Sequence, residues 1–107
     1  MDETRFNQLA DEMLARIEAA LADSSADFDY ELKPGGVIEV EFADGGKIII
    51  NRHSAAREIW IAARSGGFHF KPEGNSWVNT RDDSQLMQVL ERCLSEQAGA
   101  PVSLGKL

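Results

Sequence analysis

The chain has 107 residues, of which 43% are apolar, so it can bury one hydrophobic core and is too short to divide comfortably into two. Its single cysteine, Cys93, excludes an internal disulfide and a cysteine-rich zinc site, and we expect a reducing, cytoplasmic location. No apolar run approaches the roughly 18 residues that cross a bilayer, and the first residues are acidic, so we expect neither membrane insertion nor export.

The net charge of −7 is concentrated at one end of the chain. Residues 1–31 hold nine acidic residues and two arginines, whereas residues 32–107 hold nine acidic and nine basic residues. An anionic surface attracts cations or basic proteins and repels a phosphate backbone. We therefore expect a cation or a basic protein as the ligand, and not a nucleic acid.

An amphipathic helix is predicted over residues 3–22. Apolar side chains recur there at spacings of three and four residues, as on the buried face of a helix: Phe6, Leu9, Met13, Ile17 and Leu21. With about 3.6 residues per turn, Asp11 and Glu18 share one flank of the opposite, solvated face. Residues 23–27 are polar and form a connector.

The next part of the chain has the pattern of an antiparallel sheet. Strands are predicted over residues 29–32, 37–42, 47–52, 58–63, 68–70 and 76–79. The second is the clearest, because Ile38, Val40 and Phe42 alternate with two glutamates. An Asp-Gly-Gly sequence at residues 44–46 supplies the positive φ angles of a hairpin turn. No connector is long enough for a parallel crossover, so we expect a meander.

A second helix is predicted to end at Gly99, with Asp82 capping its start and Gln85 three residues further on. Its apolar stripe contains Leu86, Leu90, Cys93, Leu94 and Ala98. The resulting α+β fold is a two-layer α-β sandwich in which the N- and C-terminal helices lie together on one face of a five- to six-stranded antiparallel sheet. One domain over residues 1–107 is expected.

The usual catalytic motifs are absent from the sequence, including glycine-rich phosphate loops and the HExxH and CxxC spacings. His53 is expected in a loop, and His69 on the strand face opposite Phe68 and Phe70. Cys93 lies on the apolar stripe of the second helix and is expected in the core. We therefore expect no enzyme active site.

The acidic flank and Trp60 each allow two interpretations. Carboxylates on a helix are often only solvated, but unpaired carboxylates about 7 Å apart repel by roughly 0.6 kcal/mol, which a hard cation or a basic partner would relieve. Spread along a helix and an edge strand, they predict weak binding. Trp60 shares the solvated sheet face with Glu58 and Ala62. It is either a partner-binding anchor or half-covered by side chains of neighbouring strands.

Several segments resemble the frataxin family, and in particular its bacterial, CyaY-type members. The likeness lies in residues 45–52 (GGKIIINR), 58–62 (EIWIA) and 66–70 (GGFHF), with Trp77. Phe6, Leu9, Ala10, Asp11, Ile17 and Glu18 agree as well. The resemblance covers nearly the whole chain and implies the same α-β sandwich.

The resemblance also implies a function. In this family an acidic ridge on the first helix and the first strand binds Fe²⁺ and Fe³⁺ weakly and docks on a basic patch of the cysteine desulfurase of iron–sulfur cluster assembly. Matching positions for iron here are Asp2, Glu3, Asp11, Glu18, Asp23, Asp27, Asp29 and Glu31. Partner-binding positions are Glu18, Asp23 and Asp29 for the desulfurase, and Asn51 and Trp60 for the assembly partners, including the scaffold protein.

One departure from the family concerns the end of the first helix. Relatives commonly have a denser run of acids where this chain has Ala19, Ala22 and Ser25. The number of iron ions and the strength of docking therefore do not follow from the resemblance. Nor does it follow whether the chain speeds or slows assembly.

Three functions remain open at this level. The first is an iron-binding regulator or iron-delivery adaptor that is not an enzyme. The second is a ferroxidase that stores its product, although scattered carboxylates supply no fixed metal geometry. The third is a protein-interaction module indifferent to metal. A monomer that can oligomerise with iron is expected.

Overall fold

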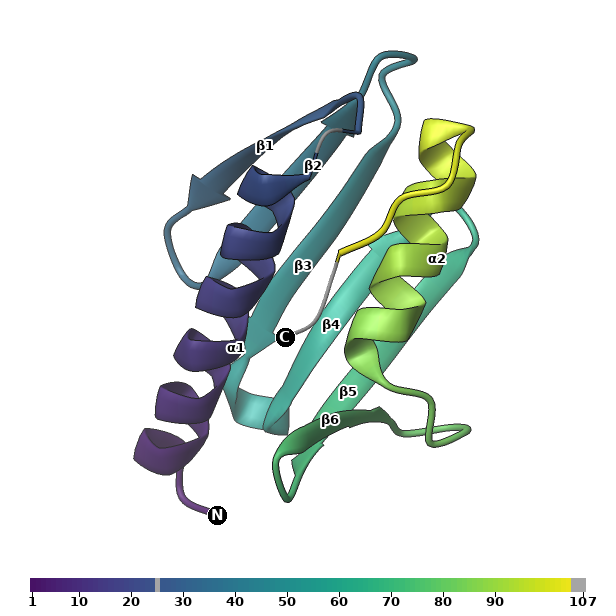
Figure 1. The fold of residues 1–107 in the computed structure, drawn as a ribbon. Coiled ribbons are helices and arrows are strands. Elements are labelled where there is room, and N and C mark those ends of the chain that lie inside the picture. Colours follow the sequence, from purple (N-terminus) through teal and green to yellow (C-terminus); the bar gives the residue numbers. More distant parts are fainter. Residues whose placement is uncertain (25, 105–107) are drawn as a thin grey trace.

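Along the described chain, one helix precedes and a second helix follows a run of six strands, in the predicted order (Figure 1). The computed structural model describes residues 1–24 and 26–104. Its elements are α1 (Glu3–Asp23), β1 (Phe28–Lys33), β2 (Val37–Phe42), β3 (Lys47–His53), a short 3-10 turn η1 (Ser54–Ala56), β4 (Glu58–Ala63), β5 (Gly66–Glu73), β6 (Ser76–Asn79) and α2 (Leu86–Ala98). Ser25, in the predicted connector, lies outside the described residues.

All six strands form one antiparallel sheet in which spatial order follows chain order, β1 to β6. The meander predicted from the short connectors is confirmed. At the turn between β2 and β3 Gly45 has φ +86°, and Asp44 Oδ1 accepts a 2.8 Å hydrogen bond from the Gly46 amide. This leaves β1 and β6 as the edge strands.

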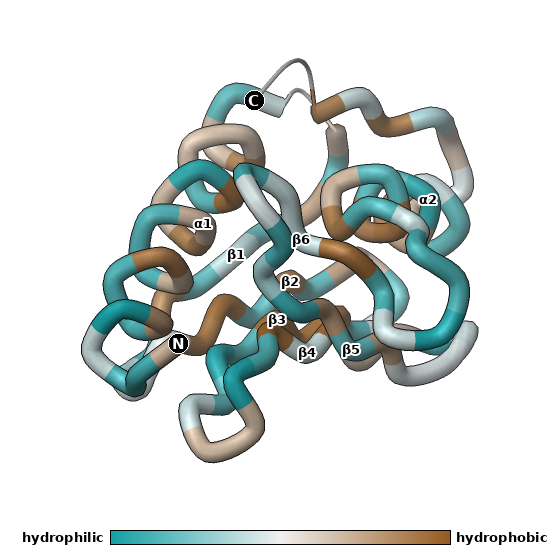
Figure 2. Tube along the Cα trace, turned by 90° about the horizontal axis from the view of Figure 1, so that it is seen from below, coloured by the Kyte–Doolittle hydropathy of each residue, from teal (hydrophilic) through white to brown (hydrophobic). Residues whose placement is uncertain are grey.

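Both helices cover the same face of the sheet, as predicted, and their apolar stripes face it (Figures 1 and 2). Phe6 and Ile17 of α1, Ile50 and Ile59 of the sheet, and Leu90 of α2 are fully buried in one core. No helix of the described residues covers the second sheet face, which we call the outer face.

Aromatic and sulfur side chains complete this core. Phe6 meets Trp77 edge to face, with ring centroids 5.9 Å apart, so Trp77 is a core residue. Cys93 is buried as predicted. In the described part of the chain, no helix is both long and apolar enough to span a membrane.

The ends of α1 and α2 agree only in part with the capping residues in the sequence. Asp2 caps α1 and accepts a 2.7 Å hydrogen bond from the Arg5 amide. Gly99, with φ +74°, ends α2 as predicted. The predicted start of α2 is wrong: Asp82 accepts hydrogen bonds from the Ser84 amide and hydroxyl, which makes a local turn, and the helix begins only at Leu86.

Two sheet boundaries also differ from the prediction. β5 spans Gly66–Glu73 rather than residues 68–70, because the turn before it contains only Arg64 and Ser65. His53 is the last residue of β3 and not part of a loop.

Candidate functional site

The α1 carboxylates that face the sheet edge are held by residues of other elements. The Asp11 side chain is 64% exposed and forms an ion pair with Arg52 of β3. Glu18 is half-buried and accepts a 2.7 Å hydrogen bond from the hydroxyl of Tyr30 on β1. This bond raises the pKa of Tyr30, because the carboxylate stabilises the phenolic proton. Asp11 thus has an internal cation, whereas Glu18 has a neutral donor.

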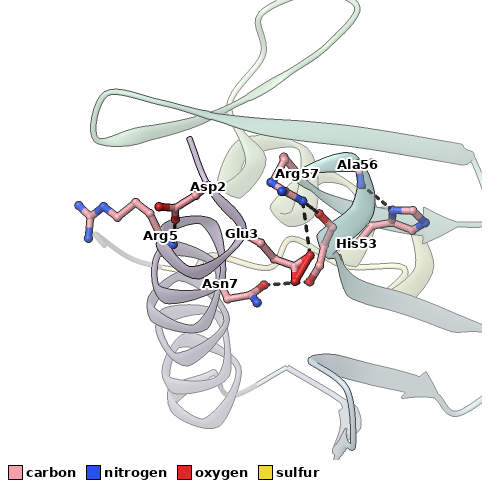
Figure 3. Close-up of polar contacts among 8 residues, drawn as sticks. Asp2, Glu3, Arg5, Asn7, His53, Ala56 and Arg57 are labelled. Atoms are coloured by element: carbon pink, nitrogen blue, oxygen red, sulfur yellow. Dashed lines mark hydrogen bonds and ion pairs between the residues drawn. The ribbon is translucent and has the colours of Figure 1, made fainter.

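The acids at the start of α1 have local roles (Figure 3). One carboxylate oxygen of Asp2 accepts the hydrogen bond that caps α1. Glu3 lies 3.7 Å from the guanidinium of Arg57, and both side chains are well exposed. The hydroxyl of Ser54 donates a 2.8 Å hydrogen bond to Asn7. These contacts join α1 to the turn η1, away from Glu18.

The remaining predicted acids lie at the junction of α1 with β1 and along β1 itself. Asp23 and Asp27 are exposed at the junction, and Asp29 and Glu31 are exposed on the strand. The register pairs Asp29 with Glu41 and Glu31 with Glu39, on the face opposite the helices. The expected ridge is therefore two acidic surfaces that meet at the free edge of β1.

Two lysines partly neutralise the acidic surface on the outer face. Glu39 forms ion pairs with Lys33 and with Lys47, the second at 2.6 Å, and its side chain is only 12% exposed. The two ammonium groups lower the pKa of Glu39 to about 2 and raise the pKa of both lysines. Glu39 and Glu41 belong to this surface but are not among the predicted acids, although the pairing of the predicted strands could have indicated them.

The arrangement does not form a closed metal cage. Among residues 1–24 and 26–104, no group of three or more histidine, cysteine or acidic side chains lies close enough to hold one ion. The acids that come closest in the register are those of β1 and β2. What the carboxylates can offer a cation is an open, hydrated surface, which matches hard ions and low affinity.

Trp60 lies between two imidazole rings on the outer face. The ring centroids are 4.0 Å from His53 and 4.3 Å from His69, with interplanar angles of 11° and 8°. Its indole nitrogen donates a 2.7 Å hydrogen bond to Glu58. Trp60 is half-buried, and the two imidazole rings that cover its faces come from neighbouring strands, as the half-covered interpretation predicts; His69 lies on the outer face as expected. Asn51 is its register partner on β3.

The fold and these surfaces match known proteins. The family model of the frataxin-like domain matches residues 1–100 of this chain. A protein of Dechloromonas aromatica (strain RCB), named iron-sulfur cluster assembly protein CyaY, is 58% identical over 104 residues, which are 97% of this chain and 99% of the relative. The frataxin of Psychromonas ingrahamii has a TM-score of 0.89 at 27% identity, covering 99% of this chain and 100% of that chain.

A more distant structure shares the fold. Trimeric frataxin from the yeast Saccharomyces cerevisiae, complexed with ferrous iron, has a TM-score of 0.65 at 24% identity and covers 92% of this chain and 88% of that chain. The match over residues 1–100 and the relative that is 58% identical establish the assignment made from the sequence segments. The chain belongs to the frataxin family.

Proposed function

We propose that the chain acts in iron–sulfur cluster assembly in the cytoplasm, as an iron-binding regulator or iron-delivery adaptor that docks on a cysteine desulfurase. Its relative from Dechloromonas aromatica bears the name of an iron-sulfur cluster assembly protein. The observation that carries the proposal is a group of exposed carboxylates around the free edge of β1: Asp23, Asp27, Asp29 and Glu31. None of the four is ion-paired with another described residue.

Iron is the expected metal, bound as hydrated Fe²⁺ or Fe³⁺. Each ion would contact one or two carboxylates at the edge of β1 and keep most of its water, because no closed ligand set is present in the described chain. Binding would relieve repulsion between like charges in the folded state. Millimolar divalent cation should therefore raise the melting temperature, and an unchanged melting temperature would contradict the proposed metal surface.

The basic partner would contact the same carboxylates. A lysine- or arginine-rich patch on the desulfurase would supply the cations that these carboxylates lack within the described chain. This predicts fast association whose rate falls as the salt concentration increases.

Asn51 and Trp60 lie on the outer face, and we propose that this face contacts the scaffold protein. Trp60 is already stacked on both sides, so it would bind through the edge of its ring.

The test is a charge reversal with a matched control. Glu18→Lys with Asp23→Lys should abolish both the Fe²⁺-induced NMR shifts, measured without oxygen, and binding of the desulfurase. Glu73→Lys with Glu96→Lys makes the same change in net charge at two exposed sites elsewhere and should leave both intact. Undiminished desulfurase binding by the first variant would contradict the proposed docking surface.

These variants, together with Trp60→Ala, separate the two other functions. A ferroxidase would consume oxygen saturably with Fe²⁺ and lose that activity with the reversed charges. A metal-independent module would lose partner binding with Trp60→Ala and would show no specific response to iron. We propose a monomer in the absence of iron, which light scattering with and without Fe²⁺ tests directly.

A further inference from the structure

One apolar side chain is exposed on the acidic side of the molecule. Leu32, near the end of β1, is 58% exposed, and among the described residues only Met1 is an equally exposed large apolar residue. Its register partner Ile38 is 2% exposed and faces the core. Leu32 therefore points to the helix side of the sheet, but at the edge, where α1 does not cover it.

Leu32 forms one wall of a groove between α1 and the first hairpin. The groove has a volume of about 290 Å³ and is lined on the helix side by Asp11, Leu14, Ala15 and Glu18. The opposite wall and the floor are formed by Leu32, Lys33, Gly36, Val37 and Ile38. Positions 11, 14, 15 and 18 follow one face of a helix, so the wall is continuous, with a carboxylate at each end and an apolar centre.

The charge at the rim of the groove is unbalanced. Asp11 is paired with Arg52, and the ammonium group of Lys33 is engaged by Glu39. Glu18 receives only the hydroxyl of Tyr30 and has no cation among residues 1–24 and 26–104. An apolar groove with one uncompensated carboxylate fits an apolar side chain that is followed or preceded by a lysine or arginine.

We propose that this groove anchors the protein partner by taking up one aliphatic side chain that lies beside a basic residue. The inference rests on the proposed docking function and adds to it a contact that does not depend on charge. The acids at the edge of β1 would steer the partner, whereas burial of Leu32 would slow its dissociation. Affinity should accordingly have a salt-sensitive part and a salt-insensitive part.

The test compares two variants over a series of salt concentrations, with the cysteine desulfurase as the probe and calorimetry as the measurement. Leu32→Thr keeps a residue suited to strands and removes apolar area, so it should weaken binding about five- to tenfold at every salt concentration. Glu18→Gln should instead reduce the steepness of the salt dependence. Glu96→Gln, the matched control, should do neither.

A further variant tests the groove in case Leu32→Thr does not fold. Ala15→Gln lies on an exposed helix position and would extend over the groove without altering Leu32. It should weaken binding as Leu32→Thr does, while the melting temperature stays unchanged. If Leu32→Thr and Ala15→Gln both bind the desulfurase as tightly as the wild type, the groove is not an anchor, while the proposed docking on the desulfurase is unaffected.

Two further outcomes are distinguishable. If the wild type fails to bind the desulfurase even at low salt, the proposed function fails and the anchor fails with it. If light scattering instead shows a dimer that Leu32→Thr converts to a monomer, the groove is occupied by a second copy of the chain. That result would overturn the proposed partner.

Discussion

The hydroxyl of Tyr30 donates a hydrogen bond to the carboxylate of Glu18, and this contact joins the edge strand β1 to α1. The bond, together with burial and the nearby negative charge, raises the pKa of Tyr30 above 10.0. Because a raised pKa favours the protonated form in the folded state, the stabilisation is complete below pH 10 and is lost as the pH rises through the folded pKa.

Tyr30 is the only tyrosine of the chain, so its phenolate absorbance can be followed without interference from another tyrosine. We expect its titration in the folded protein to lie above that of free tyrosine. Glu18→Gln should move it back toward the ordinary value, because the charge on the acceptor is removed. A Tyr30 titration that does not respond to Glu18→Gln would mean that the contact does not form in solution.

Acid should weaken the fold through Glu39. Two lysines hold its pKa at about 2, compared with an ordinary value of 4.5, so this stabilisation is present above pH 4.5 and is lost as the pH falls toward 2. Carbon-detected NMR of the Glu39 carboxyl should show the low titration directly. Glu39→Gln should reduce the change in stability between pH 5 and pH 2, whereas Glu41→Gln, a change at an exposed position on the same strand, should leave it nearly as in the wild type.

Removing Arg52 should strengthen cation binding at α1. Arg52→Gln takes away the guanidinium that faces Asp11, and a unit charge a few ångströms away is worth about 1 kcal/mol in water. We therefore expect about two- to fivefold tighter Mn²⁺ binding near Asp11, measured by paramagnetic broadening of amide signals, and a stability loss below about 1 kcal/mol. Arg64→Gln removes the cation of a different exposed pair, with Asp44, and should have no effect on α1.

The two histidines should shield Trp60. In a Trp77→Phe background, where Trp60 is the only indole, His53→Ala and His69→Ala should each increase quenching of its fluorescence by acrylamide. Each should also lower stability by about 0.5–1.5 kcal/mol, as expected for an aromatic pair. Glu58→Gln keeps both stacks and an acceptor for the indole nitrogen, so its quenching should match that of the Trp77→Phe background. Equal quenching in all four proteins would contradict the stacked arrangement.

Much of the fold could be predicted because local and periodic signals agreed. The predicted end of α1 differs from the observed one by a single residue, since its apolar spacing and the change to polar residues after Leu21 coincide. The start of α2 was misplaced because Asp82 can cap a helix or close a turn, and these alternatives have the same sequence signature. Gln85 itself is extended and forms a β-bridge with Val78, so the helix begins only after it.

The candidate site was predicted less completely, for reasons of strand geometry. Asp29 and Glu31 alternate with Tyr30, and because Tyr30 bonds to α1 the two acids must point to the other face. Grouping the acids by their position along the chain merges these two surfaces into one. The pairs of Asp11 with Arg52 and of Trp60 with the histidines join residues of different elements, which a single sequence does not reveal.

The order of the strands has a consequence for how the protein forms during synthesis. Since each strand pairs with the next one along the chain, the sheet can be completed hairpin by hairpin as it leaves the ribosome, with only short loops to close. The inner side of β5 and β6, however, stays open to water until α2, the last helix made, emerges and covers it. A stalled or truncated nascent chain without α2 would therefore leave core side chains of these strands, such as Phe70, exposed to chaperones.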